Sequence, residues 1–170
     1  MIRLDWMSKL VDCFVESKRG RLIRTCDGFY LDLSIRFHVW KQERIWCYGT
    51  EERGEQRFAD IVSPDPVPVF NWFTSQVAPS FSSRPIWLPS APEDIRPGWR
   101  VLLFEGADLG TLIAPDDRRL ELRMRTWGGH YGNLVRLSWI VDADPLTLLE
   151  SYRDANGRPL LSRFVKEDDA

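Results

Sequence analysis

The feature that most constrains the fold is a run of alternating side chains that begins directly after Asp27-Gly28. Apolar and polar residues alternate from Phe29 to Trp40, so the odd-numbered positions share one face of an extended chain and the even-numbered positions share the other. This alternation predicts a β-strand with one face in the core and one in water. Asp-Gly between two runs of β-forming residues is also a strong hairpin signal. An antiparallel sheet is therefore expected near the N-terminus.

Shorter patterns place the other elements around this strand, in the order helix, strand meander, helix, strand meander, helix. The expected helices cover residues 4–18, 67–77, 134–141 and a segment that begins at Asp144-Pro145, an N-cap residue followed by proline at the first helical position. The expected strands cover residues 22–26, 29–40, 44–48, 57–62, 100–105, 110–114 and 120–126.

The proline-rich stretch between residues 63 and 98 bears on the number of domains. Apolar residues such as Trp87 and Leu88 lie between its prolines, which favours an ordered crossover over a flexible linker. A chain of 170 residues is also the usual size of one domain. The sequence therefore predicts a single α+β domain over residues 1–170, with antiparallel β meanders, packed helices and a frayed acidic tail at 165–170.

Composition and charge narrow the classes of function. Lys and Arg number 23 and Asp and Glu number 25, for a formal net charge of −2, and no segment is basic enough to follow a nucleic-acid backbone. The chain has neither the ~20 consecutive apolar residues of a membrane span nor the pattern of a signal peptide. Three cysteines without a close pair indicate reduced thiols. We therefore expect a cytoplasmic protein that binds neither nucleic acid nor membrane.

Few residues suggest catalysis. The two histidines are His38 and His130, and Cys47 lies on the strand expected next to that of His38. A Cys–His pair can form an activated thiolate, so a small enzyme that uses Cys47 and His38 is one interpretation. The other is structural, with a buried thiol and a solvated imidazole. Zinc-ligand spacings are absent, and the glycine loop at 127–132 lacks the ending of a phosphate-binding loop, so neither metal nor cofactor is expected.

The C-terminal third carries a more specific pattern. Two motifs, Trp-Gly-Gly-His-Tyr-Gly at 127–132 and Asn-Gly-Arg-Pro-Leu-Leu at 156–161, follow Arg84-Pro85 and Pro97-Gly98. In this order they resemble the immunity protein 61 family of bacterial polymorphic toxin systems, which includes the immunity factor for the tuberculosis necrotizing toxin, an NAD glycohydrolase. The resemblance implies a non-enzymatic antitoxin. Such a protein would form a one-to-one heterodimer with a cognate NAD glycohydrolase toxin domain and keep NAD out of its cleft.

Two segments have a shape and chemistry that suit insertion into a cleft. The candidate toxin-binding residues are Glu51, Glu52, Arg53 and Glu55 at a polar tip between strands, and Trp127, His130 and Tyr131 in the glycine loop. The alternative interpretation is a solvated turn for the tip and local packing for the loop. A non-catalytic adaptor domain that binds another class of protein is a further alternative.

Overall fold

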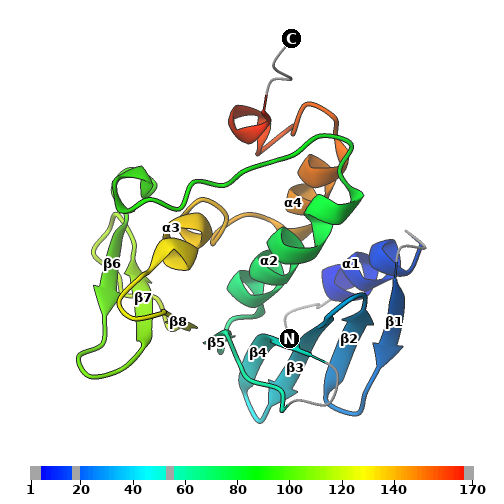
Figure 1. Ribbon diagram of the computed structural model, residues 1–170, viewed down its shortest axis with the longest axis horizontal. Helices are drawn as coiled ribbons and strands as arrows, with labels where there is room; N and C mark the ends of the chain where they lie inside the picture. The colour runs from blue at the N-terminus through cyan, green and yellow to red at the C-terminus, as the bar shows by residue number, and fades with distance from the viewer. Residues whose placement is uncertain (1–4, 17–19, 53–55, 167–170) are drawn as a thin grey trace.

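A computed structural model describes residues 5–16, 20–52 and 56–166 of the chain (Figure 1). Its strands are β1 (Arg21–Arg24), β2 (Gly28–Asp32), β3 (Arg36–Gln42), β4 (Ile45–Glu51), β5 (Ile61–Ser63), β6 (Arg100–Leu103), β7 (Leu109–Ile113) and β8 (Arg123–Arg125). Its α-helices are α1 (Asp5–Glu16), α2 (Pro66–Val77), α3 (Gly132–Ser138) and α4 (Pro145–Arg153), and short 3-10 helices occupy Ala78–Phe81, Pro92–Asp94 and Ser162–Phe164.

The strands form one antiparallel sheet in the order β1-β2-β3-β4-β5-β8-β7-β6. Helices pack on one face of this sheet: α1 contacts β1, α2 contacts β3 to β5, and α3 contacts β7. We call this the inner face and the opposite one the outer face. The α+β fold class predicted from the sequence is confirmed, and the two expected meanders are halves of a single sheet.

The alternating run that predicts one long strand is in fact a hairpin. Strands β2 and β3 are separated by a turn at residues 33–35, in which the Leu33 N–H donates to the Ile35 carbonyl (3.1 Å). Across this turn Asp32 pairs with Arg36. Because three residues separate the paired positions, odd-numbered residues keep the same face on both strands. The prediction from the alternation is therefore correct for the faces and wrong for the number of strands. A turn of this length does not interrupt the alternation, so the pattern does not reveal it.

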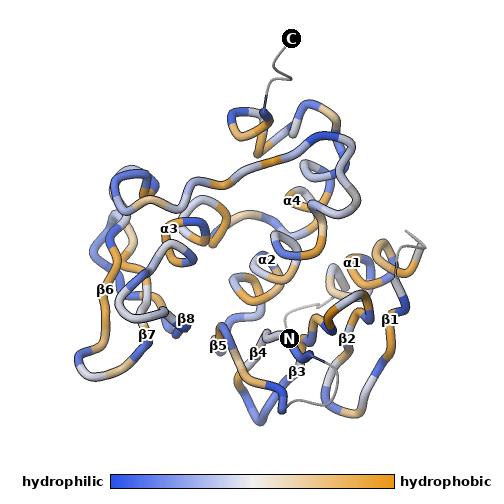
Figure 2. The backbone as a smooth tube through the Cα atoms, viewed as in Figure 1, coloured by the Kyte–Doolittle hydropathy of each residue, from blue (hydrophilic) through white to orange (hydrophobic). Residues whose placement is uncertain are grey.

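The core of the first half is built around Phe73 of α2, which is fully buried. Its ring lies edge to face with Phe14 of α1 and Phe29 of β2, at centroid distances of 5.1 and 5.5 Å. Tyr48 of β4 completes the cluster at 6.2 Å. In Figure 2, hydrophobic stretches of α1 and α2 lie beside those of the neighbouring strands. Truncating such a buried ring costs about 3–5 kcal/mol, so this cluster holds both helices on the sheet.

Two helices begin with the same signal, an aspartate followed by proline. Asp144 caps α4 by accepting a hydrogen bond from the Thr147 N–H (2.9 Å), as the sequence predicts. Asp65 caps α2 in the same way through the Val67 N–H (3.0 Å), and Pro66 occupies the first turn. The side-chain oxygen satisfies an N–H that has no partner inside the helix, which sets where each helix starts.

The two halves of the sheet meet at a narrow joint. Only two residue pairs connect β5 with β8, Ile61 with Met124 and Val62 with Arg123. In Figure 1, α2 lies between the two groups of strands. It also contacts α3 and α4, so helix packing supports the short joint.

A buried amide strengthens this connection. The side chain of Asn71 on α2 has no solvent exposure, and its amide group donates to the carbonyl oxygens of Ile140 (2.7 Å) and Ala143 (2.9 Å). Both acceptors lie between α3 and α4, where the chain has no strand or helix to satisfy its carbonyls. The hydrogen bonds therefore tie α2 to the C-terminal half.

The proline-rich crossover is ordered, as predicted, and the C-terminal segment holds it in place. Ile86 forms an isolated β-bridge with Val165, and the Trp87 N–H donates to the Phe164 carbonyl (3.0 Å). The Lys166 N–H also donates to the Pro85 carbonyl. The prediction of a frayed tail from residue 165 is therefore wrong for its first two residues, and the remainder, 167–170, lies outside the described residues.

Candidate functional site

The glycine loop forms a tight hairpin, which we call the tryptophan hairpin (Trp127–His130). The Trp127 and His130 backbones exchange two hydrogen bonds, of 3.2 and 2.9 Å, around Gly128 and Gly129. The two glycines have φ angles of +54° and +81°. Positive φ at both central positions defines the mirror-image turn that best closes a two-residue hairpin, and glycine adopts it without steric cost. The predicted tight turn is thus present, with the hairpin pairing added.

The tryptophan hairpin projects from the molecule. A Cβ atom added at Gly128 or Gly129 would meet no atom within 4 Å, and the Trp127 side chain is 63% exposed. His130 is exposed as well. Tyr131 differs, because it is half-buried and packs against the core. Of the three aromatic candidates in this loop, Trp127 and His130 are therefore exposed, and Tyr131 packs beneath the loop.

The other predicted segment, the polar tip, has a different structure from the one expected. Strand β4 runs to Glu51, three residues beyond the expected end at Tyr48, which places Glu51 opposite Arg36. The Glu51 side chain is only 16% exposed. Its carboxylate lies 2.9 Å from the Arg36 guanidinium and 2.9 Å from His38 Nε2. The interpretation of Glu51 as a solvated tip residue is therefore wrong.

Of the remaining tip residues, Glu52 is exposed, while Arg53 and Glu55 lie outside the described residues. Only two of the four candidate tip residues, Glu51 and Glu52, can therefore be placed. The structure assigns Glu51 to the sheet and leaves Glu52 at the surface.

Glu51 belongs to a polar network on the outer face of β2, β3 and β4. Tyr30 and His38 face each other across the β2–β3 pair with ring centroids 4.9 Å apart, and Arg36 lies over the Tyr30 ring. Arg36 also approaches Asp32 (3.7 Å). Burial lowers the pKa of His38, and the neighbouring Glu51 carboxylate only partly opposes this effect. We call this group the outer-face network.

The Cys47–His38 pair considered from the sequence finds little support. His38 pairs with Gly49 on β4, whereas Cys47 pairs with Trp40, so the two candidates are not direct cross-strand neighbours. Burial raises the pKa of the Cys47 thiol, which favours the protonated form. A nucleophilic cysteine needs the opposite shift. His38 was expected to be solvated and is buried instead.

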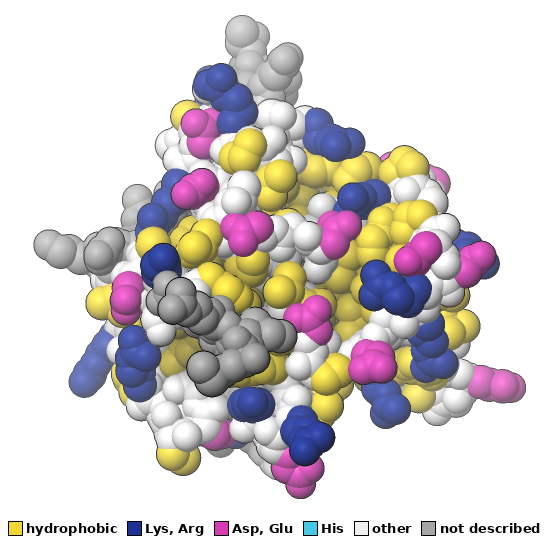
Figure 3. Space-filling view, turned by 180° about the vertical axis from the view of Figure 1, so that it is seen from behind, with side chains coloured by type: hydrophobic (Ala, Val, Ile, Leu, Met, Phe, Trp, Pro, Cys, Tyr) yellow, Lys and Arg dark blue, Asp and Glu magenta, His cyan; other side chains and the backbone are white. Residues whose placement is uncertain are grey.

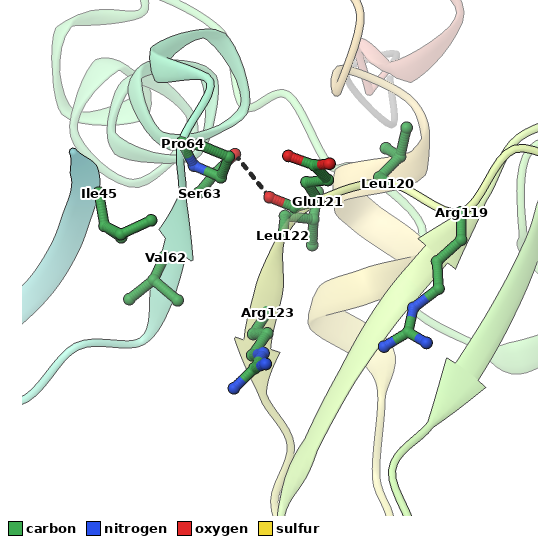
Figure 4. A pocket seen from close by; sticks show the side chains of 9 residues that line it. All are labelled: Ile45, Val62, Ser63, Pro64, Arg119, Leu120, Glu121, Leu122 and Arg123. Carbon is green, nitrogen blue, oxygen red and sulfur yellow. Dashed lines mark hydrogen bonds between the residues drawn. The ribbon is translucent and has the colours of Figure 1, made fainter.

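A groove lies at the joint between the two halves, and no sequence pattern indicates it because it depends on how the halves meet. Its volume is about 550 Å³. The lining residues are Ile45, Val62, Ser63, Pro64, Arg119, Leu120, Glu121, Leu122 and Arg123. Beyond the two β5–β8 pairs, Ser63 Oγ donates to the Glu121 carbonyl (3.1 Å) in place of a strand hydrogen bond (Figure 4). The groove thus opens where the sheet pairing ends.

Comparisons with known proteins connect this fold to a family. The model of the family described as immunity protein 61 matches residues 20–160. The chain belongs to the immunity protein 61 family. No curated protein matches its sequence.

A solved structure has the same fold as this immunity protein. Rv3902c from M. tuberculosis superimposes with a TM-score of 0.68 and 18% sequence identity, covering 90% of this chain and 91% of that chain. At this identity the likeness concerns the fold. The family match includes the outer-face network, the groove and the tryptophan hairpin, while α1 precedes it.

Two kinds of feature are not found in the described part of this family member. Within residues 5–16, 20–52 and 56–166, no three His, Cys, Asp or Glu side chains are grouped so that they could hold a metal ion. None of the helices in these segments has the length and hydrophobicity of a membrane-crossing helix.

Proposed function

We propose that this immunity protein binds a cognate NAD glycohydrolase toxin domain in a one-to-one complex and inhibits it by placing the tryptophan hairpin in the NAD-binding cleft. Family membership supports the immunity role. The observation that favours the tryptophan hairpin as the inhibitory element is the exposed Trp127 side chain on a projecting two-glycine turn. The protein acts in the cytoplasm, where the toxin would consume the producer's own NAD.

The physical reasons concern shape and preorganisation. Small-molecule sites are concave and largely apolar, so a narrow projection with one large aromatic ring is suited to fill them. An indole provides a large contact area with few rotatable bonds. The turn is already closed by two hydrogen bonds, so binding has little loop entropy to remove. The polar tip offers less, because Glu51 is held by Arg36 and His38.

The experiment that tests this function uses co-expression and a binding assay. Cellular NAD should fall when the candidate toxin is expressed alone and stay at its normal level when this protein is present. An unchanged fall in NAD would reject the toxin assignment. Occlusion is tested separately, by measuring the affinity of the purified pair with and without a non-hydrolysable NAD analogue. A saturating analogue should weaken the complex, and equal affinity under both conditions would reject cleft occlusion while leaving the immunity role intact.

A further inference from the structure

Strand β8 and the segment before it present a row of arginines to the outer face of the sheet. Arg123 and Arg125 alternate with Met124, which is buried in the core, so both point away from the helices. Arg119 lies close to Arg123, because both guanidinium groups lie over the ring of Phe104, at 4.8 and 6.0 Å from its centroid. We call Arg119, Arg123 and Arg125 the arginine strip.

The strip runs next to the tryptophan hairpin. The Arg125 guanidinium lies 5.6 Å from the centroid of Trp127 and 5.6 Å from that of Phe58. Phe58 is itself a large exposed aromatic residue. Stacking on a ring restrains a guanidinium while leaving the N–H groups at its edge free to donate. Rings therefore hold all three arginines in place.

Among the described residues, Arg119 and Arg123 have no carboxylate within ion-pair distance. Their neighbours differ: Arg118 pairs with Asp116, and Arg100 pairs with Asp117. Arg125 is partly balanced by Asp60. Burial raises the pKa of the Asp60 carboxyl group, and the charge of Arg125 acts against this effect. Elsewhere the charges are mixed, and Figure 3 shows basic and acidic side chains interspersed across the face that it presents. The strip thus carries local positive charge on a protein whose net charge is −2.

The groove lies beside the strip and has an apolar side. Val62 and Ile45 line it from the first half of the sheet, facing Arg119 and Arg123 from the second. In Figure 4 the two guanidinium groups are directed to the same side, and the Glu121 carboxylate is directed away from them. A ligand there would meet free guanidinium donors on one wall and aliphatic side chains on the other.

We propose, on the basis of the function proposed above, that the arginine strip and the groove bind an acidic segment of the toxin that borders its NAD-binding cleft. Carboxylates of that segment accept hydrogen bonds from Arg119 and Arg123, and an apolar neighbour enters the groove beside Val62. Trp127 lies at the end of the strip and enters the NAD-binding cleft of the toxin. Charge complementarity selects an acidic partner surface, because arginines held on rings without carboxylates are preorganised for bidentate recognition.

In this arrangement the arginine strip acts mainly on the association of the toxin, and the tryptophan hairpin acts mainly on its dissociation. Opposite charges at the edge of an interface mainly raise the rate of association, whereas a central aromatic anchor mainly lowers the rate of dissociation. The arginine strip should therefore govern how fast the toxin is captured, and how strongly capture depends on salt.

The experiment measures association and dissociation rates of the toxin with purified variants at several NaCl concentrations. Arg123→Glu should lower the association rate about tenfold at low salt and flatten its salt dependence, with a small effect on dissociation. The matched control is Arg163→Glu. Arg163 is also an exposed arginine held over aromatic rings, those of Trp139 and Phe164, but it lies in the C-terminal 3-10 helix. The Arg163→Glu variant has the same change in net charge as Arg123→Glu, and it should leave the association and dissociation rates unchanged.

The outcomes separate the two proposals. If the native protein does not bind the toxin, the proposed function fails. If the native protein binds and Arg123→Glu associates as fast as Arg163→Glu, the strip does not contact the toxin and this inference is overturned. Arg123→Gln, which removes charge without reversing it, should give an intermediate association rate. Melting temperatures equal to that of the native protein would show that the variants are folded.

Discussion

The outer face of the sheet carries arginines in both halves, and their surroundings differ. In the outer-face network, Arg36 is paired with Glu51. Close by, Arg57 lies over the Trp40 ring and pairs with Asp27 (2.9 Å). In the second half, Arg119 and Arg123 also lie over an aromatic ring, but without a carboxylate among the described residues. The same stacking thus occurs once where the arginines are paired with carboxylates and once at a surface where they are not. Only the second leaves hydrogen-bonding capacity for a partner.

The largest expected effect concerns the exposed end of the second half. Trp127→Ala should weaken toxin binding by about 2 kcal/mol or more, roughly 30-fold, because truncating a central aromatic anchor has a cost of this size. The free energy of unfolding should change little, since the side chain is 63% exposed. Isothermal titration with the toxin measures the first quantity, and urea denaturation the second.

Trp87→Ala is the matched control for this prediction. Trp87 is 60% exposed and lies near a lysine, as Trp127 lies near an arginine, but it belongs to the proline-rich crossover. Its removal should leave the affinity unchanged. Equal losses in the two variants would mean that the tryptophan hairpin has no special role in binding.

The second prediction tests whether the outer-face network is structural. Glu51→Ala removes the carboxylate that Arg36 and His38 share on a largely covered surface, and should lower the free energy of unfolding by about 2 kcal/mol. Toxin affinity, measured on the folded variant, should not change. Glu52→Ala, one residue further at an exposed position, should be neutral in both measurements. If the Glu51→Ala variant had native stability and bound the toxin more weakly, the outer-face network would be a binding surface and not a structural one.

A smaller effect is expected at Cys47. Its thiol is buried and protonated, so Cys47→Ala should lower the free energy of unfolding by about 1 kcal/mol through lost packing and leave protection against the toxin intact. Cys26→Ala, at an exposed position, is the control for a general effect of thiol loss. Loss of protection in a folded Cys47→Ala protein would instead favour the enzymatic interpretation.

The smallest effect is a pH dependence that belongs to the first half. Burial holds the pKa of His38 below its ordinary value of 6.5, with Arg57 and Arg36 acting in the same direction and Glu51 opposing them. Between the two pKa values the unfolded chain binds more protons than the folded one, so the free energy of unfolding should decrease as pH falls through this window. His38→Gln should flatten this dependence, and His130→Gln, at the exposed hairpin, should not. If the free energy of unfolding of His38→Gln varied with pH as in the native protein, the pH dependence would come from other groups.

Local patterns predict much of the fold and less of the site. Helical spacing and Asp144-Pro145 place helices correctly because caps and amphipathic faces are properties of neighbouring residues. The turn at 33–35 escapes detection because the alternation continues through it. Glu51 is misassigned because its partners, Arg36 and His38, lie 15 and 13 positions earlier, so its pairing depends on strand register. The tryptophan hairpin is predictable from its two glycines, whereas the groove exists only once distant strands meet.

The narrow joint between β5 and β8 also has a consequence for the order of folding. Pairs within each meander join residues close in sequence, whereas Ile61 and Met124 are far apart along the chain. Closing that long loop has an entropic cost that two residue pairs return only weakly, so each meander should form before the joint does. The contacts of α2 and the hydrogen bonds of Asn71 with the second half add to those two pairs, so we expect the joint to be completed after they form. Because the groove is part of that joint, the toxin-binding face that we propose would mature at the final step of folding.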